Sequence, residues 1–131
     1  MVCLDSDILI SFLRGDKAAE EVVSMLRQGA RGPLRTTVIN EYELVKGARQ
    51  SKVKQGNELQ VRRLISGLEI LDLDSEACDW GARIFNHLKE KGTMMNELDV
   101  LIGGIVLRNR ETLMSRDKGF EGMPELSLEE W

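Results

Sequence analysis

Residues 2–10 read VCLDSDILI, an apolar run that an acidic pair interrupts before the apolar pattern resumes. The pattern predicts a short buried strand that ends at Asp5 and passes directly into a helix. In open α/β sheets, ligands bind beside the carboxyl ends of the strands, which is where Asp5 is expected. One Asp at this place would be explained as a helix N-cap. Because one cap needs only one side chain, the pair of Asp5 and Asp7 raises the question of whether other acids meet them.

The composition is that of a globular protein. Of the 131 residues, 42% are hydrophobic and 31% are charged, so we expect one domain that spans residues 1–131. No apolar run is long enough for a membrane span and no signal peptide is recognisable, which predicts a cytoplasmic protein. Cys3 and Cys78 are expected to be small core residues, not a disulfide or a metal pair.

Several classes of site are excluded by what the sequence lacks. The single histidine, His87, cannot supply the two or three imidazoles of many zinc sites, and it argues against a Ser-His-Asp triad. The glycine pair at residues 103–104 lacks the spacing of a phosphate-binding loop and predicts close helix packing. The net charge of -4 argues against a broad basic surface for nucleic acid. Carboxylates that hold metal ions would still allow contact with phosphates.

Strand patterns alternate with helical patterns along the chain, which predicts an α/β domain with a mainly parallel sheet. After the first strand we expect strands near residues 33–36, 68–73 and 112–115, and a short edge strand near 126–128. The helices between them are expected to start after caps at Asp16, Thr37, Ser75 and Asn96, with a further helix at residues 58–66.

The helix that begins at Val38 carries two acids that compete for a role. Glu41 and Glu43 each lie about 100° from Tyr42, one on either side of the apolar face. Periodicity places Glu41 inside the apolar arc and Glu43 at its margin, so it favours Glu41 as the more enclosed acid. Two solvated helix carboxylates would be the simplest explanation of the pair.

Two more acids lie at the ends of predicted elements. Asp99 is in the first turn of a helix whose residues 100–107 are apolar all round, and such a helix is buried. An acid beside it is desolvated unless a positive or hydrogen-bonding group compensates. A capping-box arrangement with Asn96 would explain Asp99 alone. Asp117 follows the strand at residues 112–115.

Four acids at such places are hard to explain as four separate caps. Asp5, Asp99, Asp117 and a glutamate of the helix after the second strand are all expected at one edge of the sheet. Carboxylates without imidazole or thiolate select hard ions, so Mg²⁺ or Mn²⁺ is expected. Ions held in this way most often serve phosphoryl transfer or phosphodiester cleavage.

With these acids in this order, the sequence resembles a known family, the PIN-domain ribonucleases, and within it the VapC toxins of toxin–antitoxin pairs. Residues 4–10, LDSDILI, resemble the family's Asp-Thr-Asn motif, with Asp5 as its acid. Residues 43–48, ELVKGA, are similar to its Glu-Leu-x-x-Gly-Ala motif, which identifies Glu43 as the second acid. Motif and periodicity disagree here. We follow the motif, because an acid that serves a site at the sheet edge should lie at the margin of the buried face.

The second half of the chain carries the rest of the resemblance. Residues 99–104, DVLIGG, resemble the family's Asp-x-Leu-Ile-Ala-Ala, with two glycines as the small pair. Residues 115–117, SRD, are similar to its closing Thr-x-Asp, and Phe120 with Trp131 fits the family's ending. Each motif is short, and it is their order and spacing along the whole chain that makes the match specific.

The resemblance implies a three-layer α/β/α sandwich and an endoribonuclease that depends on Mg²⁺ or Mn²⁺. It implies an RNA substrate, an antitoxin protein that occupies the active-site groove, and a homodimer. The residues it implies as catalytic groups and metal ligands are Asp5, Glu43, Asp99 and Asp117, supported by Ser6, Asp7 and Ser115 through hydrogen bonds.

Two departures from the family pattern and two rival functions stay open. Asp7 is acidic where the family often has Asn or Ser, and Glu41 stands where an apolar residue is usual, so either could add a metal ligand. The first rival is an inactive binding module of the same fold. The second is a metal-dependent phosphatase or phospho-acceptor domain, which would need a phosphate-contacting Lys such as Lys118 after one of its last strands.

Overall fold

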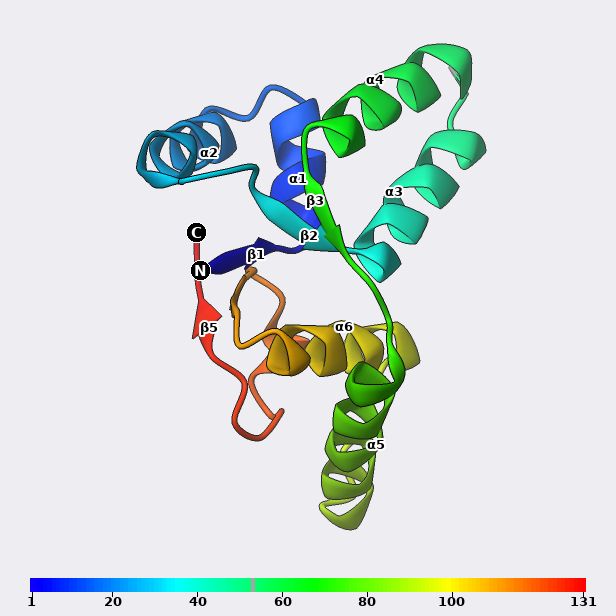
Figure 1. Ribbon diagram of the computed structural model, residues 1–131. Helices are drawn as coiled ribbons and strands as arrows, with labels where there is room; N and C mark the ends of the chain where they lie inside the picture. Colours follow the sequence, from blue (N-terminus) through cyan, green and yellow to red (C-terminus); the bar gives the residue numbers. More distant parts are fainter. Residues whose placement is uncertain (53) are drawn as a thin grey trace.

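The computed structural model describes residues 1–52 and 54–131, and it is built around one parallel sheet. The five strands lie in the order β3-β2-β1-β4-β5, and every pairing between neighbours is parallel (Figure 1). The predicted α/β fold is therefore confirmed. The strands are β1 (Val2–Leu4), β2 (Arg35–Thr37), β3 (Glu69–Leu71), β4 (Thr112–Met114) and β5 (Leu128–Glu129).

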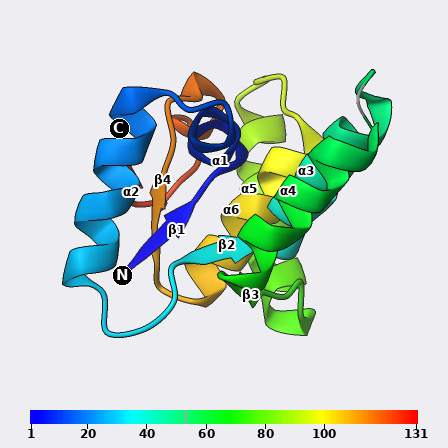
Figure 2. The ribbon, with the colours of Figure 1, turned by 90° about the horizontal axis from the view of Figure 1, so that it is seen from above.

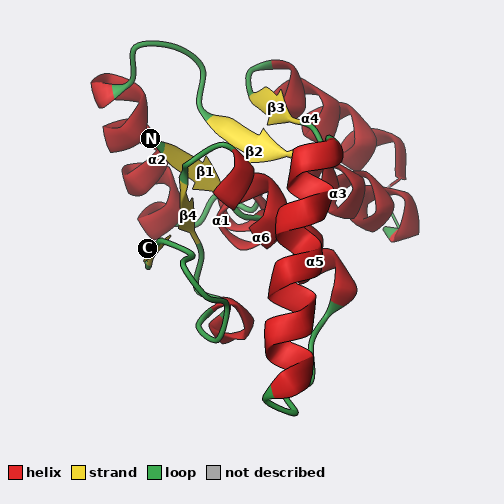
Figure 3. Ribbon diagram, turned by 60° about the horizontal axis from the view of Figure 1, so that its bottom comes forward, coloured by secondary structure: helices red, strands yellow, loops and turns green. Residues whose placement is uncertain are grey.

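Helices cover both faces of this sheet. Figure 1 shows α1 to α4 on one side and α5 with α6 on the other, and Figure 2 shows the same helices from above. The secondary-structure colouring of Figure 3 makes the small sheet visible among them. The helices are α1 (Ser6–Leu13), α2 (Lys17–Gly29), α3 (Val38–Gln50), α4 (Lys54–Ser66), α5 (Ser75–Glu90) and α6 (Glu97–Arg108), followed by the 3₁₀ turn η1 (Lys118–Phe120).

The core is divided into two clusters by the sheet, as the period of a β-strand requires. Cys3 and Leu113 belong to the cluster that α5 and α6 cover, whereas Leu4 and Met114 belong to the cluster under α1 to α4. Because successive strand residues point to opposite faces, each central strand supplies both clusters. This arrangement is the predicted three-layer sandwich.

The helix α3 buries a different face from the one that periodicity indicated. Its buried residues are Asn40, Leu44 and Ala48, whereas Tyr42, the expected centre of the apolar face, is 51% exposed. The prediction was wrong because it counted only apolar side chains. Asn40 is fully buried through hydrogen bonds, and it turns the helix so that its own side faces the sheet.

The helix caps were predicted in part. Asp16, Thr37 and Asn96 accept hydrogen bonds from the backbone of their first turns, as expected. Ser75 does not cap α5, because the preceding Asp74 accepts from the amide of Ala77 at 2.8 Å. No helix in the described part of the chain is long and apolar enough to cross a membrane.

One cysteine is in the core and the other is not. Cys3 is fully buried in β1, but Cys78 is exposed on α5, and the two form no disulfide. The buried face of α5 is Ala77, Gly81, Ile84 and Leu88, so Cys78 lies one helical step outside it. The expectation of a core position for Cys78 was therefore wrong.

The glycine pair of α6 is explained by close helix packing, as predicted. A Cβ atom on Gly104 would lie 2.5 Å from the carbonyl oxygen of Ala77 and 2.9 Å from the amide nitrogen of Gly81. Both obstacles are backbone atoms of α5 and cannot rotate away. The close approach of these two helices therefore depends on the missing side chain.

We expect Gly104→Ala to destabilise the protein by about 1–3 kcal/mol, because the methyl group overpacks the contact between α5 and α6. Gly47→Ala is the matched control, since a Cβ atom there meets nothing within 4 Å. Alanine at that position should be neutral or stabilising by up to about 1 kcal/mol. Urea unfolding measures both variants, and equal stability of the two would contradict the packing argument.

Candidate active site

Asp5 is the most enclosed acid of the site and lies directly after the central strand β1. Its residue is 5% exposed, and its amide continues the pairing with β4 by donating to the carbonyl of Met114 at 3.1 Å. One carboxylate oxygen accepts from Ser115 Oγ at 2.6 Å and the other from Asn40 Nδ2 at 2.8 Å. Burial raises the pKa of Asp5 to about 6, although these hydrogen bonds act in the opposite direction.

Glu43 is joined to Asp5 through two neighbours. Ser6 Oγ donates to Glu43 Oε1 at 2.8 Å, and Asn40 Nδ2 donates to Ser6 Oγ at 2.9 Å. Asn40 therefore links the acid of β1 with the acid of α3. Asn40 is not part of the motifs, although its position one helical turn before Glu43 indicates a shared face.

Glu41 lies elsewhere on α3. It lines a shallow hollow together with Tyr42, Lys46 and Arg49. The structure thus places Glu43, which the motif favoured, beside Ser6, and places Glu41, which periodicity favoured, in a separate hollow.

Asp99 lies in the first turn of α6 and is partly buried. In the described part of the chain no hydrogen bond reaches its carboxylate, and the cap of α6 is supplied by Asn96. The pKa of Asp99 is raised to about 6, first by desolvation and then by the negative charges of Asp117, Asp5 and Glu43. Asp117, Asp5 and Glu43 are therefore close enough to Asp99 to act on it electrostatically.

Asp117 and Ser115 complete this edge from the segment after β4. Asp117 Oδ1 accepts from the amide of Gly119 at 2.8 Å, and the amide of Asp117 donates to Ser115 Oγ at 3.0 Å. A Cβ atom built on Gly119 would lie 3.1 Å from Asp117 Oδ1 and 3.5 Å from Asp99 Oδ2. Both carboxylates thus face the same glycine.

Asp7 belongs to a different set of contacts from the other acids. Its Oδ2 accepts from the amide of Arg116 at 2.7 Å and from Ser115 Oγ at 3.3 Å. Its Oδ1 accepts from the indole nitrogen of Trp131 at 3.2 Å. Among the described residues, Asp7 is thus tied to the end of the chain, and it touches Asp5 only through Ser115.

The chemistry of the site fits a hard cation. Asp5, Glu43, Asp99 and Asp117 offer only oxygen ligands, and none of them forms an ion pair with a Lys, Arg or His within the described residues. Repelling carboxylates without a counter-charge are stabilised by a divalent ion. Across residues 1–52 and 54–131, however, no three Asp, Glu, His or Cys side chains lie close enough together to hold a metal ion without rearrangement.

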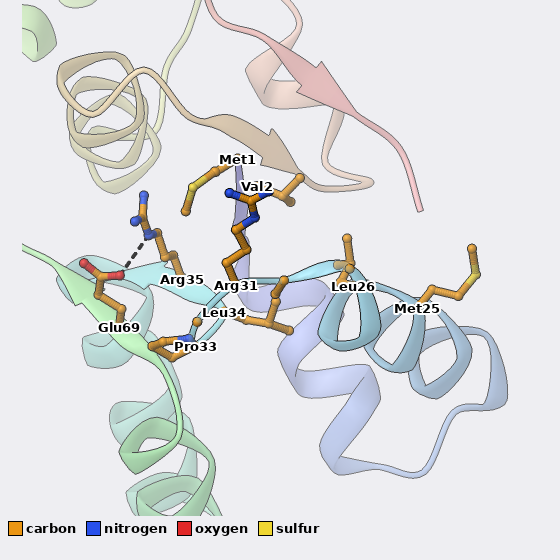
Figure 4. Close-up of a pocket in the computed structure, with 12 residues that line it drawn as sticks. Met1, Val2, Met25, Leu26, Arg31, Pro33, Leu34, Arg35 and Glu69 are labelled. Carbon is orange, nitrogen blue, oxygen red and sulfur yellow. Dashed lines mark hydrogen bonds and ion pairs between the residues drawn. The ribbon is translucent and has the colours of Figure 1, made fainter.

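A hollow lies at the opposite edge of the sheet. It has a volume of about 600 Å³ and is lined by residues near the amino ends of β1, β2 and β3. Figure 4 shows Met25, Pro33 and Leu34 around it, and the guanidinium of Arg35 paired with Glu69 at 2.9 Å. Because none of the four clustered acids reaches this hollow, it is not the candidate active site.

Taken together, the sheet order and the positions of the acids define a parallel α/β domain with four acids at the carboxyl edge of its sheet. The family model for the PIN domain matches residues 2–126, so the chain belongs to the PIN domain family. The resemblance that the motifs indicated is confirmed.

Two curated relatives carry the name VapC. The chain is 30% identical to Ribonuclease VapC2 of Rickettsia felis over 90 residues, which cover 68% of this chain and 67% of that protein. It is 32% identical to the tRNA(fMet)-specific endonuclease VapC of Salmonella typhimurium over 94 residues, 71% of each.

Solved structures with the same fold include toxin–antitoxin complexes. VapBC2 from Rickettsia felis, bound to a DNA fragment from its promoter, matches with a TM-score of 0.91 at 24% identity over 100% of this chain and 99% of that one. DNA-bound VapBC from Salmonella typhimurium matches with a TM-score of 0.87 at 26% identity, over 99% and 97%. These likenesses extend over the whole described fold.

The raised pKa of Asp99 predicts how metal-free stability depends on pH. Its folded pKa of about 6 lies above the unfolded value of about 3.9, so the native state gains protons as pH falls through this window. The contribution of Asp99 to stability is then most favourable below about pH 4 and is lost as pH rises through 6. We expect Asp99→Asn, in chelator at pH 7, to be more stable than wild type by up to about 1 kcal/mol, discounted for partial solvation.

The same comparison at pH 4.5 should show a smaller difference, because wild-type Asp99 is then mostly protonated. Urea unfolding at both pH values supplies the measurement. Asp79→Asn, on the exposed face of α5, is the control and should show no such dependence. A gain for Asp99→Asn that is as large at pH 4.5 as at pH 7 would count against desolvation and repulsion as its cause.

Proposed function

We propose that this protein is a metal-dependent endoribonuclease and the toxin of a toxin–antitoxin pair. The observation that carries the proposal is the position of four acids at one edge of the sheet: Asn40 and Ser6 link Asp5 with Glu43, and Asp99 and Asp117 face the same glycine, Gly119. The names of the two VapC relatives, a ribonuclease and an endonuclease specific for tRNA(fMet), support the same reaction class.

The proposed ligands of Mg²⁺ or Mn²⁺ are Asp5, Glu43, Asp99 and Asp117, directly or through water. When bound, the ion neutralises charge on the scissile phosphate and activates the attacking water. Asn40 and Ser115 hold Asp5 from two sides, with Asn40 on one carboxylate oxygen and Ser115 on the other. These bonds fix the orientation of the carboxylate that would hold the ion.

Glu43 and Asp99 differ in how they are prepared for this role. Ser6 fixes one oxygen of Glu43, so this carboxylate has a defined orientation before any ion arrives. Asp99 receives no hydrogen bond among the described residues, and the charges of Asp117, Asp5 and Glu43 act on it. Its carboxylate is therefore free of protein donors, and a bound cation would offset this repulsion.

The rival functions are less well supported. An inactive binding module would have no need for four unpaired acids at the sheet edge. A phospho-acceptor domain needs a Lys directed at its phosphate, but the ammonium of Lys118 lies 3.3 Å from Glu121 and 3.9 Å from Glu130. Phosphodiester cleavage thus uses more of the site than either rival does.

The proposed antitoxin would bind beside Glu43. A hollow of about 280 Å³ opens between α1, α3 and α4, and Glu43 forms part of its wall. Apolar Ile10, Leu13 and Val61 line it together with Arg14. A segment with apolar side chains seated there would reach the acids, which supports an inhibitory partner. The homodimer is a proposal that rests on the family resemblance, and the cytoplasmic location is a proposal that rests on the sequence pattern.

The two glutamates of α3 give a direct test of the catalytic assignment. Glu43→Gln should lower kcat/KM for RNA cleavage at least about 100-fold, because a ligand charge is lost beside the ion. Glu41→Gln, in its separate hollow, should stay within about threefold of wild type. Cleavage of a tRNA(fMet) transcript and of a mixed RNA pool would be followed with Mn²⁺, with Mg²⁺ and with chelator.

The outcome that sinks this assignment is the reverse ranking, with Glu41→Gln inactive and Glu43→Gln active. Equal rates in metal and in chelator would remove the metal from the proposal. Cleavage that requires metal, with loss only in Glu43→Gln, would support both the site and the reaction class.

A further inference from the structure

Trp131 meets the active-site edge from the far end of the chain. The strand β5 pairs in parallel with β4, with Met114 opposite Glu129, and the amide of Ser115 donates to the carbonyl of Glu129 at 3.0 Å. The same register, continued past the strand ends, brings residue 131 beside residue 116. The guanidinium carbon of Arg116 lies 3.6 Å from the ring centre of Trp131. The position of the indole is thus set by sheet pairing and by cation–π stacking.

The contacts continue from Trp131 to Asp5 in three steps. The indole nitrogen donates to Asp7 Oδ1 at 3.2 Å, and Asp7 Oδ2 accepts from Ser115 Oγ at 3.3 Å and from the amide of Arg116 at 2.7 Å. Ser115 Oγ lies 2.6 Å from Asp5 Oδ2. The Nε of Arg116 also donates to the main-chain oxygen of Trp131, so Arg116 contacts both the ring and the backbone of this residue.

Asp7 is held by several donors, in contrast to Asp99. Its two oxygens accept from the indole of Trp131 and from the amides of Ile8 and Arg116. Ser115 Oγ, 3.3 Å from Asp7 Oδ2, has one proton, which it shares with Asp5 Oδ2 at 2.6 Å. Three N–H donors therefore fix Asp7 beside Ser115, and these contacts favour an orienting role for Asp7 over direct coordination.

We propose that Trp131 and Asp7 are positioning residues of the metal site: the indole N–H fixes Asp7, and Asp7 fixes Ser115, which orients the carboxylate of Asp5. The proposal rests on the proposed function, because it assumes that Asp5 holds an ion. It assigns Asp7 to orientation and not to coordination. Loss of a partner that orients a metal ligand typically lowers metal affinity about 10–100-fold, and a residue one step further out should have a smaller effect.

Trp131→Phe is the primary test, since it keeps an aromatic ring for Arg116 to stack on and removes the indole N–H together with one of the two fused rings. Trp80→Phe is the matched control, because Trp80 is also stacked by an arginine, Arg83 at 4.8 Å, but lies on α5. Binding of Mn²⁺ would be measured directly by the loss of the free-ion electron paramagnetic resonance signal, at a temperature where all variants are folded.

We expect Trp131→Phe to weaken Mn²⁺ binding about three- to tenfold, and Trp80→Phe to change it less than about twofold. Asp7→Ala should weaken it at least as much as Trp131→Phe. The variant that combines Asp7→Ala with Trp131→Phe should bind Mn²⁺ no more weakly than Asp7→Ala alone, because both changes act through one chain of contacts. The amide of Ile8 also donates to Asp7, and this backbone donor is present in every variant.

A second readout tests the contact without metal. In Trp80→Phe only one indole signal remains in a ¹H–¹⁵N spectrum, that of Trp131. Adding Asp7→Ala should move this signal upfield and speed its exchange with solvent, because the charged acceptor is gone. The signal thus reports on the first step of the chain even if a variant is less stable.

The outcomes separate the inference from the proposed function. If the wild type binds no Mn²⁺, both fail together. If the wild type binds Mn²⁺ but Trp131→Phe behaves like Trp80→Phe, only the inference fails. Effects of Asp7→Ala and Trp131→Phe that multiply in the double variant would also overturn it, since independent sites cannot form one positioning chain.

Discussion

The burial of one carboxylate, that of Asp5, is the constraint on which the rest of the site depends. A buried acid is costly unless hydrogen bonds satisfy it, and Asp5 is 5% exposed. Its partners come from both flanks of β1: Asn40 from the helix after β2, and Ser115 from the segment after β4. The order β2-β1-β4 in the sheet is what brings these two segments to the same place. The hydrogen bonds that satisfy the buried carboxylate of Asp5 therefore depend on this order of strands.

The acids around Asp5 are arranged at the expense of stability without metal. Asp99 carries a pKa of about 6 because burial and three like charges disfavour its ionised form. A purely structural site would pair such charges with Lys or Arg, as Arg35 is paired with Glu69 at the opposite edge of the sheet. Retention of unfavourable local charge is typical of functional sites, where the missing counter-charge arrives with a ligand.

The sequence predicted the elements better than it predicted their buried polar contacts. The ends of strands and the starts of helices were readable, because apolar periods, caps and acids mark them locally. Hydrophobic periodicity misplaced the inner face of α3, because Asn40 is buried by hydrogen bonds that no apolar count detects. The motif selected Glu43 instead, and in the structure Glu43 accepts from Ser6, which also contacts Asn40.

Contacts between distant parts of the chain were the least predictable. The bond between the indole of Trp131 and Asp7 joins residues 124 positions apart, and no local pattern indicates it. It became visible only when the register of β5 against β4 was known. By contrast, the choice of Ser75 over Asp74 as the cap of α5 was a local ambiguity between adjacent residues that both cap well.

The simplest explanation of acids at helix starts is capping, and the structure shows how far that explanation reaches. Asp117 does cap its short 3₁₀ turn, with one oxygen bonded to the amide of Gly119. Asp5 precedes α1 but makes no side-chain cap bond, and the cap of α6 comes from Asn96, which leaves Asp99 without that task. Both acids nevertheless lie at helix amino termini, where the partial positive charge of the backbone favours an anion. The helices thus offset part of the repulsion between these carboxylates without occupying the oxygens that a cation would need.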